Sequence, residues 1–136
     1  MGLWRQDQRF APIPAWLLEI VEPVLADVQQ PTPIELLMGF QAPCTLWLSE
    51  PGDPGVDGFV PWDEAADTSP AVVRVIEFAD WLQEQFLFES RSAWGQARPA
   101  CPGHTHPASA TEIDGEAWWA CPYESRPIAP IGRLGR

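Results

Sequence analysis

Two cysteines, each followed by a proline, flank a hairpin signal in the last third of the chain, and this arrangement constrains the fold most. Three positions after Cys101 and Cys121 come His104 and Glu124, side chains that can also bind a metal ion. Between the two turns, Asp-Gly at 114–115 separates strand-like segments at 110–113 and 116–120, and this dipeptide is a strong short signal for a β-hairpin. Because a hairpin brings its two ends together, the sequence predicts that the Cys-Pro turns lie side by side.

A pair of such turns can supply the four side chains that a structural zinc ion binds in a tetrahedron. Two cysteines and one of the two histidines would be good ligands, whereas Glu124 is a weak fourth and Cys44 a distant alternative. The sequence is compatible with three outcomes: a structural zinc, a relic site without metal, and an open catalytic zinc that binds water. The candidate ligands are Cys101, His104, His106, Cys121 and Glu124.

The segment 101–124 resembles a zinc ribbon, a family in which Cys-Pro-x-Cys occurs twice. Here the two motifs read Cys-Pro-Gly-His and Cys-Pro-Tyr-Glu, so this chain departs from the family at the last position of each turn. The resemblance implies a metal site carried by a β-hairpin. The pattern Cys-Pro-Gly-His-Thr-His-Pro followed by Trp-Ala-Cys-Pro is also similar to the tails of small uncharacterised bacterial proteins, a likeness that implies no activity.

Apolar residues at steps of three and four predict one long helix over 70–90. Phe78, Trp81 and Phe88 lie outside the apolar stripe that this spacing forms, so apolar residues cover much of the circumference of the helix. The helix is therefore expected to be central to the core or covered by a partner. With the hairpin, this predicts an α+β fold with the helix on a small antiparallel sheet. We expect a body over 1–98 and a zinc-ribbon-like tail over 99–136 that packs on it as one unit. The stripe consists of Val72, Val75, Ile76, Ala79, Leu82 and Phe86.

Four shorter elements complete the expected secondary structure. A helix is predicted over 15–28, with a break or kink at Pro23 because proline removes a backbone donor and clashes one turn back. The apolar run at 34–38 is expected to form a short helix or turn that Gly39 ends. Strands are predicted at 44–49, between two prolines, and at 126–131, as a third strand of the tail.

The charge balance bears on partners. The 136-residue chain has a formal net charge of −11, and all eight of its Lys and Arg residues are arginine. An excess of acid repels phosphate backbones and anionic membrane surfaces, so we expect neither nucleic-acid nor membrane binding, while a basic protein partner is permitted. With eight tryptophans and 46% hydrophobic residues, the chain is expected to be globular and to expose an aromatic interaction surface.

The cysteine count and the absence of a leader indicate the compartment. Three cysteines is an odd number, which does not fit a framework of paired disulfides. The sequence shows neither a basic start followed by an apolar run nor an apolar stretch as long as a membrane span. We therefore expect a cytoplasmic protein whose thiols are reduced or bound to metal.

Two functions of different classes fit these features. The sequence contains no phosphate-cradling glycine loop, dinucleotide fingerprint or Gly-x-Ser-x-Gly elbow. The first hypothesis is a small protein-interaction or regulatory module with a structural or relic zinc site, which is not an enzyme. The alternative is a zinc-dependent, hydrolase-type enzyme in which Cys101, Cys121 and one histidine leave a position for water. The fourth ligand discriminates between them, because a protein side chain there closes the site.

Overall fold

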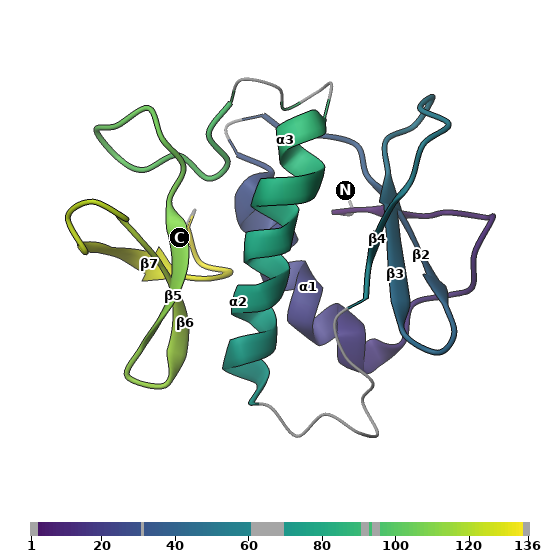
Figure 1. Cartoon of the computed structure of the whole chain (residues 1–136), viewed down its shortest axis with the longest axis horizontal. Coiled ribbons are helices and arrows are strands. Elements are labelled where there is room, and N and C mark those ends of the chain that lie inside the picture. Colours follow the sequence, from purple (N-terminus) through teal and green to yellow (C-terminus); the bar gives the residue numbers. More distant parts are fainter. Residues whose placement is uncertain (1–2, 31, 61–69, 91–92, 94–95, 135–136) are drawn as a thin grey trace.

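The chain folds into two small β-sheets with helices between them (Figure 1). The computed structural model describes residues 3–30, 32–60, 70–90, 93 and 96–134. The N-terminal sheet lies on one side of the helices and the C-terminal sheet on the other. This is the α+β class that the sequence predicts: the expected C-terminal hairpin belongs to a three-stranded sheet of its own, and the N-terminal sheet contains one parallel pair among its antiparallel ones.

The N-terminal sheet has the strand order β1-β2-β3-β4, with β1 parallel to β2 and the other pairs antiparallel. The predicted strand at 44–49 is confirmed as β3. The short helix or turn expected at 34–38 is wrong, because β2 begins there and pairs along its whole length with β3. Gly39 does not end a helix; a Cβ atom at this position would lie 2.4 Å from Cβ of Phe10, so the close approach of the chain requires glycine. The strands are Arg5–Gln6, Leu37–Gln41, Thr45–Ser49 and Asp57–Phe59.

Helix α1 (Ala15–Val28) continues through Pro23, so of the two expected outcomes, a break or a kink, the break is wrong. One face of α1 is fully buried, including Leu17, Val21 and Val24. Each buried aliphatic side chain contributes roughly 1.5–3 kcal/mol, so together they outweigh the ~3 kcal/mol that an interior proline costs a helix. Tertiary packing therefore maintains a helix that local preference would interrupt.

The long helix predicted over 70–90 is confirmed as three consecutive segments: α2 (Ala71–Trp81), a π-helical turn η1 (Leu82–Phe86) and α3 (Leu87–Glu89). This helix lies between the two sheets, so side chains on more than one of its faces are covered, which explains why apolar residues occupy much of its circumference (Figure 1). The buried face differs from the predicted stripe, since Phe78 is fully buried and Val72 and Val75 are only half-buried. Phe78 and Trp81 meet Phe59 of β4, with ring centroids 5.3 and 5.1 Å away.

The C-terminal sheet confirms both the predicted hairpin and its third strand. It consists of β5 (Ser109–Ile113), β6 (Glu116–Ala120) and β7 (Pro127–Pro130), all antiparallel. Asp114 and Gly115 have φ values of 51° and 82°, and two positive values are what a type I′ turn requires. The turn fixes the register of β5 on β6 and thereby the position of the residues just outside the hairpin.

Buried Asp27 at the end of α1 connects the helix layer with the C-terminal sheet. Its carboxylate accepts hydrogen bonds from Nε1 of Trp119 at 2.7 Å, from the backbone N–H of Gly132 at 2.6 Å and from that of Leu134 at 3.2 Å. Gly132 also lies against Pro23, because a Cβ atom at this glycine would be 3.0 Å from Cβ of the proline. These contacts hold the tail sheet against α1.

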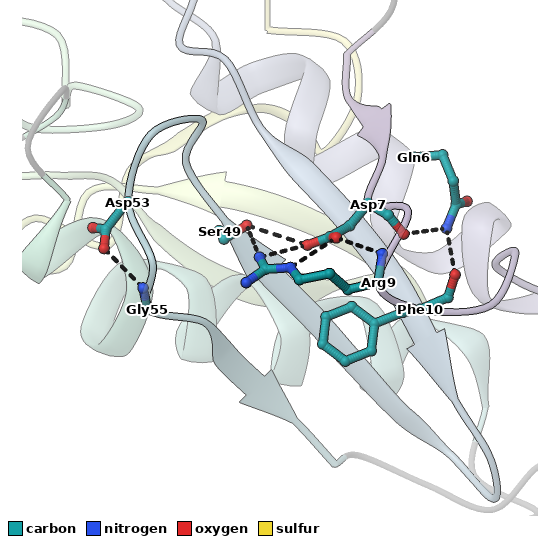
Figure 2. Close-up of polar contacts among 7 residues, drawn as sticks. All are labelled: Gln6, Asp7, Arg9, Phe10, Ser49, Asp53 and Gly55. Atoms are coloured by element: carbon teal, nitrogen blue, oxygen red, sulfur yellow. Dashed lines mark hydrogen bonds and ion pairs between the residues drawn. The ribbon is translucent and has the colours of Figure 1, made fainter.

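A second buried carboxylate, Asp7, lies at the edge of the N-terminal sheet (Figure 2). Arg9 donates to both of its oxygens, from Nε at 3.0 Å and Nη2 at 2.8 Å, and the backbone N–H of Arg9 adds a third bond at 3.0 Å. Ser49 of β3 donates to the same carboxylate at 3.5 Å. The hydrogen-bonded guanidinium holds the pKa of the Asp7 carboxyl below its usual value, although burial acts in the opposite direction.

We expect Asp7→Asn to destabilise the protein by about 1–2 kcal/mol at pH 7, a modest loss because Arg9 is half exposed. A carboxyl with a lowered folded-state pKa contributes stability above its unfolded pKa of about 3.9, and that contribution disappears as pH falls through the folded value. The difference between wild type and variant should therefore shrink from pH 7 to pH 3 in urea unfolding. Glu35→Gln, at an exposed ion pair, is the control, and a pH-independent difference would contradict this account.

No helix in the described ranges combines the length and the apolar character that a membrane span needs.

Candidate metal centre

The two Cys-Pro turns have closely related backbones. In the first, the N–H of Cys101 donates to the carbonyl of His106 at 3.1 Å, and in the second the N–H of Cys121 donates to the carbonyl of Arg126 at 2.8 Å. Each turn contains one residue with positive φ, Gly103 at 80° and Ser125 at 54°. In the first turn the chain curls so that Nδ1 of His104 lies 3.3 Å from the sulfur of Cys101, whereas in the second turn backbone N–H groups of Tyr123 and Glu124 face the sulfur of Cys121.

The hairpin positions the turns, as the sequence predicts. Ser109, the first residue of β5, is paired with Ala120, the last of β6, so the segments outside both strands begin at the same end of the sheet. An isolated bridge between Ala100 and Pro107 closes the base of the first turn. Cys101 and Cys121 therefore become neighbours, and each is only 1% exposed.

Four donor atoms converge at this end of the sheet. They come from Cys101, His104, His106 and Cys121, and all lie within 4.8 Å of one another. Nδ1 of His104 is 3.3 Å from the sulfur of Cys101 and 3.7 Å from that of Cys121. Zinc distances of about 2.3 Å to sulfur and about 2.0–2.1 Å to nitrogen place two such atoms about 3.6 Å apart at a tetrahedral angle. The two spacings of His104 match tetrahedral edges, and the group of four can hold a metal ion.

The two imidazoles stack, with ring centroids 4.7 Å apart, and each presents one nitrogen to the group. Nδ1 of His106 lies 3.0 Å from the carbonyl oxygen of Pro107, and since a carbonyl can only accept, Nδ1 carries the proton. Nε2 of His106 then has the lone pair, is buried, and makes no hydrogen bond to any described residue. Leaving a buried polar atom unpaired costs about 1–3 kcal/mol, a cost that a bound metal ion would remove.

The two thiols differ in acidity. Burial raises the pKa of Cys101, and the neighbouring sulfur of Cys121 raises it further. Burial alone would also raise the pKa of Cys121. Hydrogen bonds from the backbone N–H groups of Glu124 and Tyr123 and from the Cys101 thiol outweigh burial, so the pKa of Cys121 is lowered. Backbone N–H groups that stabilise a thiolate suit a metal ligand, because the thiolate is the form that binds metal.

Glu124, a predicted ligand, lies outside the group of four. Its Oε1 is 3.5 Å from Nε2 of His104, the ring nitrogen that does not face the sulfurs, and its Oε2 accepts from Nε of Arg126 at 3.2 Å. Cys44, the distant alternative, lies in the turn between β2 and β3 of the other sheet, where it is half-buried.

Sequence reasoning missed that both histidines join the group at once. The signal was present in their spacing, because side chains two positions apart point to the same side of an extended chain, and the two rings stack here.

Comparison with known protein families, with curated proteins and with solved structures gives no significant match, so the functional inference rests on the geometry of these four side chains.

Proposed function

We propose that this protein is a small interaction or regulatory module whose C-terminal sheet is stabilised by one structural zinc ion. The ligands are the sulfurs of Cys101 and Cys121, Nδ1 of His104 and Nε2 of His106. The observation that carries the proposal is Nε2 of His106, which is buried beside three other donors and makes no hydrogen bond within the described part of the chain. Its tautomer is already the one that a metal ligand needs.

The donor set favours zinc over other common divalent ions. Two thiolates and two imidazoles are soft to borderline ligands, whereas calcium and magnesium bind oxygen. Four protein ligands complete a tetrahedron and leave no position for a water molecule, the arrangement typical of structural zinc. A resemblance to zinc ribbons on residues 101–124 supports the same assignment.

The alternative, a zinc-dependent hydrolase, requires an open metal position beside a substrate cavity. The described surface has cavities of about 380, 410 and 240 Å³, and their described linings include none of the four ligands. The second of these is lined by Thr105 and Pro107, the neighbours of His106, but not by the histidine itself. Four convergent ligands, none of which lines any of these three cavities, favour the structural role.

Surface chemistry supports the interaction part of the proposal. Phe88 and Tyr123 are 74% and 79% exposed, and Tyr123 stands in the second Cys-Pro turn with its ring edge-on to His106 at 4.7 Å. Exposed aromatic side chains are enriched at protein interfaces. The net charge of −11 favours a basic protein partner and disfavours nucleic acid, and the reduced thiols are in keeping with a cytoplasmic site of action.

Metal analysis tests the proposal directly. Protein purified without added metal or chelator is expected to contain one zinc ion per chain, and its cobalt-substituted form should show the visible absorption of a tetrahedral site with two sulfur ligands. A protein that purifies without metal and does not take up Zn²⁺ or Co²⁺ at micromolar concentration would favour the relic site. A site that binds metal together with an exchangeable water would favour the enzyme.

A further inference from the structure

We infer that Glu124 is not a metal ligand but positions His104 from outside the coordination sphere, and that Arg126 in turn holds Glu124. This inference rests on the proposed zinc site. It assigns a role to the one predicted ligand that the structure leaves outside the group of four.

The orientation of the His104 ring carries the first step. Nδ1 faces both sulfurs, at 3.3 and 3.7 Å, and Nε2 lies on the other side of the ring, 3.5 Å from Oε1 of Glu124. A neutral imidazole has one N–H and one lone pair, and a carboxylate can only accept a proton or hydrogen bond. Glu124 therefore favours the tautomer with the proton on Nε2, which leaves the lone pair of Nδ1 directed at the metal position.

Arg126 fixes the carboxylate in this place. Its Nε donates to Oε2 of Glu124 at 3.2 Å, and its Nη2 donates to the carbonyl of Pro102 at 3.4 Å. Pro102 belongs to the first turn and Glu124 to the second, so the guanidinium bridges the two turns. Arg126 and Glu124 of the second turn thus form a series of polar contacts that ends at His104, a ligand in the first turn.

Both histidines then have an acceptor on the nitrogen that does not bind metal. For His106 it is the carbonyl of Pro107, a backbone group that no side-chain substitution removes, and for His104 it is the carboxylate. Such partners set the tautomer and the ring orientation, and their loss typically costs 10–100-fold in metal affinity. The carboxylate is about half exposed, with a relative exposure of 53%, so we expect an effect of about 10-fold, at the lower end of that range.

The test compares zinc affinities, measured by competition with a chromophoric chelator, for wild type, Glu124→Ala and Glu124→Gln. The alanine variant should bind Zn²⁺ about 10-fold more weakly. The glutamine variant should recover part of the affinity, because its amide oxygen can still accept from Nε2. Glu112→Ala, which removes an exposed carboxylate from β5 of the same sheet, should change the affinity less than 2-fold and controls for net charge.

Cobalt spectra separate positioning from ligation. Glu124→Ala should keep the visible absorption of the wild type, since all four ligands remain, whereas His106→Ala should alter it by admitting water. The inference is overturned if Glu124→Ala binds zinc as tightly as wild type, or if it alters the cobalt spectrum while His106→Ala does not. A wild-type chain that binds neither ion overturns the proposed zinc site itself, and the inference with it.

Discussion

Replacing Cys101 by serine is expected to abolish stoichiometric zinc binding and to lower the melting temperature by more than about 10 °C. Binding of a structural zinc ion releases roughly 10–16 kcal/mol in small zinc domains at pH 7, and much of that free energy is folding free energy because the unfolded chain has no preformed site. Three remaining ligands bind more weakly and admit water. The loss should also leave buried Cys121 and the two half-buried histidines without a metal.

Two controls make this result specific. Cys44→Ser changes a half-buried thiol in the other sheet and should leave the zinc content unchanged. A chelator added to wild type should lower its melting temperature nearly as far as the substitution does, and should change the melting temperature of Cys101→Ser very little. If Cys101→Ser melts within about 3 °C of wild type, the substitution is only a small packing defect and the site is a metal-free relic.

The parts of the fold that the sequence predicts correctly depend on local signals. The hairpin follows from Asp-Gly at 114–115, and the helix over 71–89 follows from apolar spacing, both readable within one short window. Strand β2 was missed because its short apolar run has no period that separates helix from strand, and because the pairing with β3 decides its form. The expected break at Pro23 follows from local preference alone, whereas burial of one face of α1 decides the outcome.

The candidate site was predicted in outline because two repeated Cys-Pro motifs mark it, and the structure brings four of the five named residues together. The role of Glu124 could not be predicted, because spacing does not say which ring nitrogen of His104 faces the sulfurs. Buried Arg98 shows the same limit: it donates to the carbonyls of Val28 and Thr32, about 70 positions earlier, at 2.9 and 2.6 Å. Contacts over such separations leave no pattern in the sequence.

Asp27→Ala is expected to destabilise the protein by about 3–5 kcal/mol, the second large effect. The substitution removes the acceptor of three hydrogen bonds in a buried site and leaves the Trp119 indole and two backbone N–H groups unpaired. Each unpaired buried donor costs about 1–3 kcal/mol, and partial solvent access at Gly132 and Leu134 keeps the total below the simple sum. Asp27→Asn, which retains one acceptor oxygen, should lose less.

This substitution also tests whether the tail over 99–136 packs on the body over 1–98 as one unit. Asp27 lies in α1 and its three donors lie in the tail, so its bonds connect the two parts directly. In urea unfolding the wild type should show one transition, and Asp27→Ala should shift it without splitting it. Hydrogen exchange should speed up at the amides of Gly132 and Leu134 before it does so in β2 and β3.

A double-mutant cycle with Trp119→Phe isolates the indole contact from general destabilisation. If the indole bond is part of the loss, the two substitutions together should cost less than the sum of the single effects, because each removes the same hydrogen bond. Additive effects would show that Asp27 acts only through the two backbone amides. Two separate urea transitions in Asp27→Ala, one of them removed by a chelator, would instead show that the zinc-bound tail folds on its own and that Asp27 only docks it against α1.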